Sequence, residues 1–313
     1  MFKKFIFSFL TIISSFCFAQ KNDSAFYVFK QVERNLQDLQ KKTFFSRSEK
    51  ERIEGNKEFM REWEKIIANP KILEYPFDSL REISILTPKD KKFKLITWNL
   101  AREDGSHAFF GYLLVNNSKR IKTGFLKHEL QYSYEYFRLI DRSATVKNPE
   151  TYIGTTDKWF GMLYTQLISC DDFYTLIGWD GNDKLTQRKF VDVLSFRGDG
   201  TPVFGKDVFK FPKKNPKRLM FEWSQEVSMS LKYVEKRDLI VYNHLSSKQE
   251  GSVLDGQLQY YGPDGRYDAL QLQKDKWVVL ENVEANSDIA PLKESKKPDP
   301  KKNKKRMPEY KSK

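Results

Sequence analysis

The densest group of oxygen-bearing side chains in the sequence lies between residues 171 and 183. Two aspartates precede an apolar run and three further side chains follow it: Asp171, Asp172, Asp180, Asn182 and Asp183. Clustered carboxylate and carbonyl oxygens bind calcium, and Gly181 permits a sharp turn among them. The spacing differs from an EF-hand, because Lys184 occupies the fifth position of such a loop. We weigh a calcium site formed by these five residues against the simpler interpretation, a tight turn after Trp179. The sequence suggests no other cofactor.

Asp192 is the carboxylate whose surroundings are most unusual. Period-two alternation places it on the same strand face as Phe190, Leu194 and Phe196. A carboxylate among apolar neighbours must find hydrogen-bonding partners or take up a proton. Buried carboxylates with shifted pKa values concentrate at functional sites, although structural ion pairs also produce them. We favour a structural pair with a nearby cation such as Arg188.

The candidates for acid–base catalysis are Asp192, Asp180, Asp183 and His244. His244 follows a short β-rich run, in a position where loops often carry function. No pair of histidines has the spacing of a zinc site, and no Gly-x-Ser-x-Gly elbow occurs. Cys170 follows an apolar run and reads as a small buried residue.

Two classes of function remain open. The first is a non-catalytic binding or structural β domain, which is favoured because the sequence lacks the catalytic motifs considered above. The 25 Phe, 15 Tyr and 6 Trp residues also favour it, because aromatic side chains suit contacts with glycans or proteins. The alternative is a secreted hydrolase that uses two carboxylates roughly 5–10 Å apart. Its candidate carboxylates are Asp171, Asp172, Asp180, Asp183, Asp192 and Glu222.

The N-terminal part, residues 20–91, is predicted to be helical. Apolar residues recur at three- and four-residue steps at Phe26, Phe29, Val32, Leu36 and Leu39. A second helix carries Ile53, Met60, Trp63, Ile66 and Ile67 and ends at Asn69-Pro70. A third, shorter helix is expected over 78–86. These apolar stripes predict faces that pack on a core.

Residues 92–284 are predicted to form an antiparallel β domain, a sandwich or open barrel, with a degenerate propeller as the alternative. Short aromatic and β-branched runs alternate with turn residues. The runs are Phe93–Trp98, Ala108–Val115, Trp159–Ile168, Phe173–Trp179, Lys189–Phe196, Leu219–Trp223, Ser228–Tyr233, Leu239–Asn243, Gln257–Tyr261, Tyr267–Leu272 and Trp277–Leu280. Gly198-Asp199-Gly200 and Gly262-Pro263-Asp264-Gly265 are expected to be hairpin turns. The tryptophans show no fixed period, which disfavours propeller blades.

Residues 1–19 have the three zones of a cleaved signal peptide. Lys3 and Lys4 precede an apolar run that ends near Ala19, and polar residues follow from Gln20. We therefore expect export to the periplasm or the exterior, with the mature chain starting at Gln20. The alternative is an outer-membrane lipoprotein modified at Cys17, which we rank second because the bulky Phe16 precedes that cysteine.

The net charge of +13 is unevenly distributed. Residues 293–313 contain ten Lys/Arg and three Asp/Glu, and two further positive charges lie in the signal segment. The remaining body has an ordinary charge balance, so nucleic-acid binding is not expected. The basic tail, residues 285–313, is predicted to be disordered and to be capable of touching an anionic membrane surface.

Several segments together resemble a group of uncharacterised exported proteins from Bacteroidota. They are Phe173–Asp183, Arg188–Phe196, Thr201–Gly205, Ser228–Tyr233 and Tyr260–Tyr267. The resemblance covers roughly Phe93 to Trp277. It implies a cell-envelope location and carries over no catalytic residue. An unidentified envelope protein or glycan is the expected partner.

Overall fold

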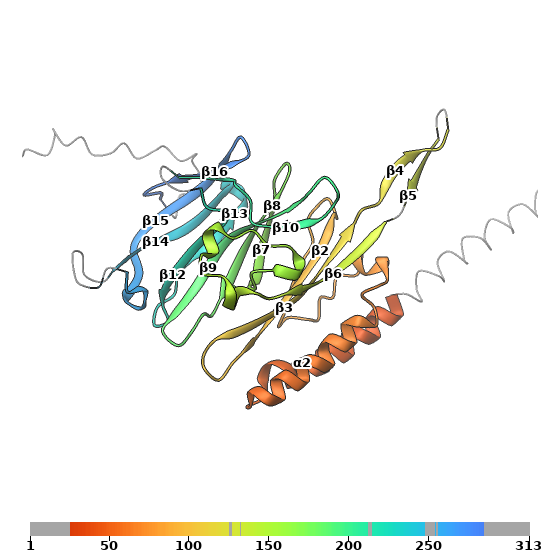
Figure 1. The fold of residues 1–313 in the computed structure, drawn as a ribbon, viewed down its shortest axis with the longest axis horizontal. Coiled ribbons are helices and arrows are strands. Elements are labelled where there is room, and N and C mark those ends of the chain that lie inside the picture. The colour runs from red at the N-terminus through yellow and green to blue at the C-terminus, as the bar shows by residue number, and fades with distance from the viewer. Residues whose placement is uncertain are drawn as a thin grey trace, which may run out of the picture.

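The computed structural model describes residues 26–284, except 125–126, 132, 212–214, 248–253 and 255. Helices come first and antiparallel sheets follow, as the sequence predicts (Figure 1). The signal segment, Gln20, Cys17 and the 285–313 tail lie outside the described residues. No helix within the described ranges has the length and apolar character needed to cross a bilayer.

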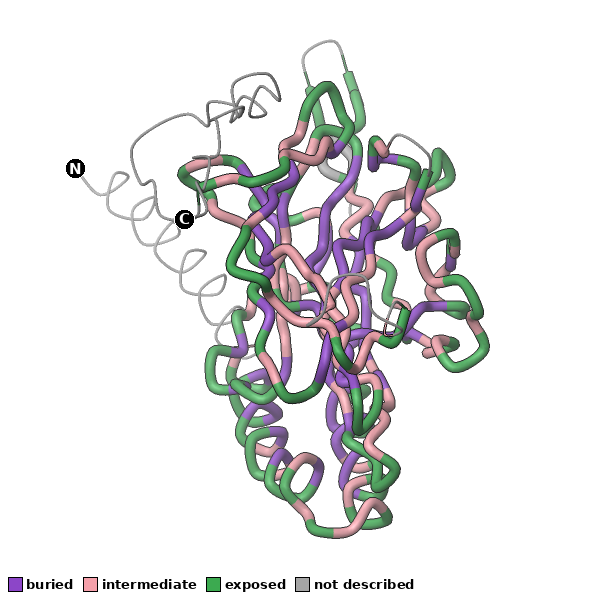
Figure 2. The backbone as a smooth tube through the Cα atoms, turned by 90° about the vertical axis from the view of Figure 1, so that its left-hand side faces the viewer, coloured by how far each residue is buried: buried purple, intermediate pink, exposed green. Residues whose placement is uncertain are grey.

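Two helices form the outermost layer. Residues 26–45 are helical, and α2 (Glu49–Glu64) follows, with the Ser48 side chain accepting a hydrogen bond from Glu51 N as its N-cap. The predicted apolar faces are largely confirmed: Phe29, Leu36, Phe59 and Trp63 are fully buried. Ile53, by contrast, is exposed. Figure 2 shows the buried stripe of the helices turned toward the sheets.

Three larger sheets contain most of the strands. The first sheet has the order β1 (Ser84–Leu86), β2 (Phe93–Ala101), β3 (His107–Asn116) and β6 (Tyr134–Ile140). The central sheet has the order β10 (Pro202–Phe204), β9 (Thr186–Phe196), β8 (Tyr174–Asp180) and β7 (Leu163–Ser169), with β12 (Leu219–Ser224) also paired to β9. The third sheet has the order β11 (Phe209–Lys210), β16 (Lys276–Leu280), β15 (Tyr261–Gln273), β14 (Leu239–Ser247) and β13 (Leu231–Val234).

The remaining elements are short. A two-stranded ribbon of β4 (Lys119–Lys122) and β5 (His128–Gln131) extends the β3–β6 hairpin away from the body (Figure 1). In the part of the chain that the structure describes, six 3₁₀ segments connect the larger elements: η1 (Pro70–Leu73), η2 (Ser143–Thr145), η3 (Pro149–Thr151), η4 (Thr156–Lys158), η5 (Glu235–Arg237) and η6 (Leu258–Tyr260). Among the described residues, all strand pairs are antiparallel except β11 with β16.

The helices and the sheets stack as successive layers. Alternate residues of β2 face opposite sides: Trp98 packs in the core beneath the helices, whereas Leu95 packs in the core shared with the central sheet. The other face of the central sheet packs on the third sheet through residues such as Val191 and Trp277. The described strands therefore form a stack of open sheets, which matches the predicted sandwich, and they close no barrel.

Three local predictions are wrong. The segment predicted as a third helix, 78–86, contains turns and β1, because pairing with β2 outweighs a short helical pattern. The predicted Gly262–Gly265 turn lies inside β15, which pairs with β14 across a bulge between Asn243 and Leu245. Most of the predicted strand over 257–261 is the 3₁₀ segment η6.

The Gly198-Asp199-Gly200 turn is confirmed. It connects β9 with β10, and Gly200 has a φ of +90°, a conformation that costs glycine little. Asp199 Oδ1 accepts a hydrogen bond from Thr201 N at 2.9 Å, which closes the turn.

One buried hydrogen bond ties the helical layer to the first sheet. Trp98 Nε1 donates to Asn56 Oδ1 at 2.7 Å, and both side chains are buried. We expect Asn56→Ala to lower the free energy of unfolding by about 1–2 kcal/mol, because the indole N–H loses its partner. Lys57→Ala, at an exposed ion pair on the same helix, is the control and should change stability by less than about 1 kcal/mol. Urea unfolding measures both, and equal effects would contradict the assigned role of Asn56.

Candidate functional site

Asp192 lies in the core between the first and central sheets and is completely buried, as its alternation with apolar residues predicts. Its partner is Arg218, however, and not Arg188. Arg218 Nε donates to Asp192 Oδ1 at 3.0 Å, and Nη2 donates to Oδ2 at 3.4 Å. Tyr164 Oη donates to Oδ2 at 2.7 Å, and the backbone N–H of Val193 donates to Oδ1 at 2.9 Å. The carboxylate is therefore a satisfied structural group.

The buried Arg218 extends this network to the connection between β6 and β7, residues 141–162. Its Nη1 donates to the carbonyl oxygen of Pro149 at 3.1 Å. Its guanidinium carbon lies 5.1 Å from the ring centroid of Phe160 and 5.8 Å from that of Tyr152. The backbone N–H of Lys217 adds a 2.6 Å hydrogen bond to the carbonyl oxygen of Glu150. The buried ion pair thus holds the 141–162 connection against the central sheet.

The two ends of this connection are tied to each other through Asp141, and its middle is fixed to β10 through Gly154. Asp141 Oδ1 accepts hydrogen bonds from Ser143 N at 2.8 Å and from Gly161 N at 3.1 Å. Gly154 and Phe204 exchange two backbone hydrogen bonds of 2.8–2.9 Å. Connections between secondary-structure elements in compact domains are commonly about 4–6 residues long. This one spans 141–162 and contains η2, η3 and η4.

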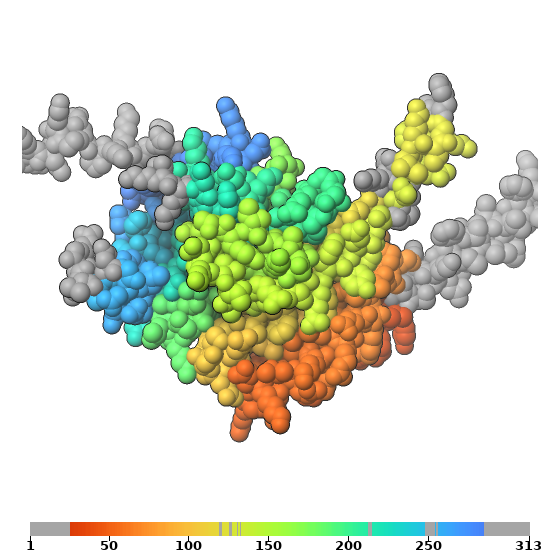
Figure 3. Space-filling model, in the orientation of Figure 1, coloured from red at the N-terminus to blue at the C-terminus, as the bar shows by residue number. Residues whose placement is uncertain are grey.

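A cavity of about 780 Å³ opens along the 141–162 connection. The residues of the connection cover the middle of the face shown in Figure 3, where they are yellow-green. Apolar and cationic side chains share the lining, together with Thr, Asn and one carboxylate: Ile140, Arg142, Thr145, Val146, Lys147, Asn148, Thr151, Tyr152, Ile153, Asp157 and Lys158. Its volume lies within the range of roughly 300–1,000 Å³ typical of small-molecule sites. Sequence analysis missed this cavity, because its residues form no motif.

The predicted calcium ligands are divided between the two ends of β8. Asp171 and Asp172 precede the strand, whereas Asp180, Asn182 and Asp183 end it or follow it. At roughly 3.3 Å per residue the two groups are about 20 Å apart. Within the described residues, no group of three or more His, Cys, Asp or Glu side chains is arranged to hold a metal ion. The predicted five-residue site is therefore not formed.

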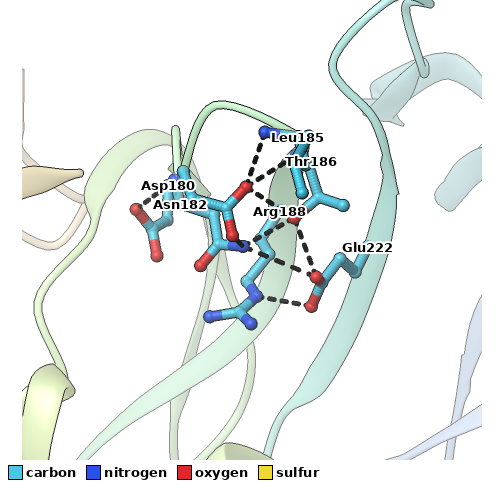
Figure 4. A network of polar contacts seen from close by, with 7 residues as sticks. Asp180, Asn182, Leu185, Thr186, Arg188 and Glu222 are labelled. Atoms are coloured by element: carbon cyan, nitrogen blue, oxygen red, sulfur yellow. Dashed lines mark hydrogen bonds and ion pairs between the residues drawn. The ribbon is translucent and has the colours of Figure 1, made fainter. Parts of the chain in front are cut away.

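The residues after β8 form the turn that was the simpler interpretation (Figure 4). Asp183 Oδ1 accepts hydrogen bonds from Leu185 N at 2.7 Å and Thr186 N at 2.8 Å. Thr186 Oγ1 donates to Glu222 Oε1 at 2.8 Å, and Arg188 Nε donates to Glu222 Oε2 at 2.6 Å. Asp183, Glu222 and Arg188 are thus engaged in holding the turn and strands β9 and β12 together.

Asp180 differs from its neighbours because burial raises its pKa to about 6. The backbone N–H of Asn182 donates to Asp180 Oδ1 at 2.8 Å. That hydrogen bond and the charge of Arg188 lower the pKa in part, whereas Asp141 and Glu222 raise it. A carboxyl group with this pKa is suited to general acid chemistry, but only 7% of the residue is exposed.

Of the predicted catalytic candidates, Asp180 and Asp183 meet at the turn after β8, where Asn182 donates hydrogen bonds to both, whereas Asp192 and His244 lie elsewhere. Asp192 pairs in register with Leu176, which lies four residues before Asp180 on β8, so the two carboxyl groups are about 13 Å apart along the strands. That separation exceeds the spacing required for glycoside hydrolysis. His244 lies on the third sheet, where its Nδ1 is 2.8 Å from Asp268 Oδ2.

Burial raises the pKa of the Cys170 thiol to about 11, which disfavours the thiolate that a nucleophile requires.

The aromatic side chains were expected to provide contact surfaces. Five of the six tryptophans are fully buried in the cores, and Trp179 is partly exposed. The large aromatic side chains exposed among the described residues are Tyr27, Phe45, Tyr136 and Tyr260.

No protein-family model, curated protein or solved structure matches the chain. The assignment of the cavity along the 141–162 connection as a candidate site therefore rests on the geometry of the described residues.

We expect Asp192→Asn to lower the free energy of unfolding by about 3–5 kcal/mol, because Arg218 then keeps a buried and uncompensated charge. Asp172→Asn is the matched control: it makes the same substitution at the exposed Asp172–Lys206 pair and should cost less than about 1 kcal/mol. Urea unfolding of both variants measures the difference. A change below about 0.5 kcal/mol for Asp192→Asn would contradict the structural role.

The stability of the protein should also depend on pH through Asp180. Its folded pKa of about 6 lies above the ordinary value of 3.8, so the folded protein binds a proton that the unfolded chain releases between these values. This contribution to stability is present below about pH 4 and is lost as pH rises to about 6. The Asp180→Asn variant has no carboxyl group to titrate at this position, so it does not lose this stability as pH rises. Its free energy of unfolding minus that of wild type should therefore be greater at pH 7 than at pH 4, by up to about 3 kcal/mol.

Urea unfolding of wild type and Asp180→Asn at both pH values tests this expectation, because other titrating groups cancel in the difference. Asp199→Asn is a control of opposite sign, since hydrogen bonds from Thr201 lower the pKa of Asp199. Its stability relative to wild type should be lower at pH 7 than at pH 4. An unchanged difference for Asp180→Asn would show that its carboxyl is not destabilised by burial.

Proposed function

We propose that this protein is exported to the cell envelope, where it acts as a non-catalytic β domain that binds an envelope component in the cavity along the 141–162 connection. One observation carries the proposal. The connection is long and is fixed at both ends and in its middle, and a cavity of ligand size opens along it. A preformed site loses little conformational entropy on binding.

The state of the carboxylates favours binding over catalysis. Asp192 forms a buried ion pair with Arg218, and Asp183 and Glu222 hold the turn after β8 through hydrogen bonds. The secreted hydrolase remains the alternative, and Asp180 is the residue that favours it, because its raised pKa suits a general acid.

Export is proposed on the N-terminal sequence pattern, in which a positive start and an apolar run precede Ala19. The resemblance to exported Bacteroidota proteins supports the same compartment. A lipoprotein anchored through Cys17 is the second form of the proposal. In either form the folded body faces envelope glycans and proteins, and the basic tail is available to anionic membrane surfaces.

Cosedimentation of the purified protein with washed cell envelopes tests the proposal. We expect wild type to be retained, and Thr151→Trp to be retained roughly tenfold less, because an indole at this exposed position of the lining fills part of the cavity. Leu185→Trp is the control: it also places an indole on the surface, at an exposed residue outside the cavity lining.

Equal retention of the two tryptophan variants would place binding elsewhere on the molecule. The same envelope samples should release no new reducing ends over time. Release that depends on Asp180 would instead establish the hydrolase.

A further inference from the structure

Three cationic side chains line the cavity: Arg142, Lys147 and Lys158. All three are exposed, and none takes part in the ion pairs formed among the described residues. Arg142 provides a planar guanidinium that can bind two oxygens of one anion, whereas the lysines provide compact charges. Within the described residues, the cavity therefore presents three cations that are not engaged in an ion pair of 4 Å or less.

One carboxylate, Asp157, lies in the same lining. Thr155 Oγ1 donates a hydrogen bond to it at 2.5 Å, and this contact, together with the charges of Lys158 and Arg142, lowers the pKa of Asp157. Asp157 is therefore ionised at neutral pH. Three cations and one carboxylate leave the cavity with a net charge of +2. A single carboxylate on a ligand would neutralise half of this charge, whereas a phosphate monoester, at about −1.5 to −2, would neutralise nearly all of it.

The frame that carries these cations is ordered. Arg142 N donates to the carbonyl oxygen of Trp159 at 2.8 Å, and Lys158 N donates to that of Thr155 at 3.0 Å. Tyr152 Oη donates to the carbonyl oxygen of Lys158 at 2.8 Å, which fixes the ring in the lining. Tyr152 and Ile153 provide apolar surface for the body of a ligand beside the charged groups. This arrangement suits a small molecule with one doubly charged end.

We infer that the cavity binds a phosphate monoester carried on a small body, such as a phosphorylated sugar or a phosphomonoester lipid headgroup. The inference deepens the proposed function and rests on the same cavity. Because the cations are exposed to solvent, binding weakens as salt rises.

Isothermal titration calorimetry at low ionic strength tests the inference with glucose 6-phosphate, inorganic phosphate and glucose. We expect glucose 6-phosphate to bind, inorganic phosphate to bind more weakly, and glucose to give no measurable heat. Arg142→Gln and Lys158→Gln should each raise the Kd for glucose 6-phosphate about tenfold, because each removes a charge-assisted contact. Lys236→Gln, an exposed cation on η5 outside the cavity, is the matched control and should leave the Kd unchanged.

Vesicles of phosphatidylcholine with and without phosphatidic acid distinguish the two sources of the phosphate. Binding that requires phosphatidic acid and is weakened by Arg142→Gln supports the lipid headgroup, whereas binding of glucose 6-phosphate alone supports the soluble ester. The inference is overturned if no phosphorylated probe binds, or if Arg142→Gln and Lys158→Gln bind as wild type does.

These outcomes separate the inference from the proposed function. If Thr151→Trp loses envelope retention while no phosphorylated probe binds, the cavity remains a binding site and the ligand class is wrong. If phosphate esters bind but Thr151→Trp is retained on envelopes like wild type, the inference stands and the envelope function fails.

Discussion

The buried ion pair between Asp192 and Arg218 is the interaction on which the site depends. Both side chains are fully buried, and each is satisfied by further contacts: Asp192 by Tyr164 and Val193, and Arg218 by the carbonyl oxygen of Pro149. Removal of either partner leaves a charge in an apolar core, which is far more costly than breaking a surface pair. The pair therefore joins β9 to the segment before β12 and fixes the 141–162 connection in place.

This constraint explains why the cavity is preformed although its lining is largely exposed. Exposed loops ordinarily sample many conformations, and ordering them on binding reduces affinity. Here the backbone is held by the buried pair below and by Asp141 at the start of the connection. The exposed cations are thus placed on an ordered frame, which favours recognition of a charged ligand. Of the carboxylates considered for catalysis, Asp192 serves to hold this frame through Arg218.

The secondary structure was predictable where the pattern was long or the alternation regular. The stripe from Phe26 to Leu39 and the alternation of β9 both placed side chains on the correct faces. Short patterns failed. Residues 84–86 form β1 because β2 supplies a pairing partner, and Gly262–Gly265 continue β15 because β14 pairs alongside them. In both cases a neighbouring strand, distant in sequence, outweighed the local preference.

The sequence alone determined that Asp192 must be buried and paired, because alternation on a strand fixes the face of each side chain and an unpaired buried charge is too costly. It did not determine the partner. Arg218 lies in a polar stretch that reads as surface, and only the pairing of β12 with β9 brings it beneath the 141–162 connection. The tertiary structure likewise decided that Arg142, Lys147 and Lys158 line one cavity. The connection that carries them is held by backbone hydrogen bonds to β10 and to the residues before β12, which are distant in sequence.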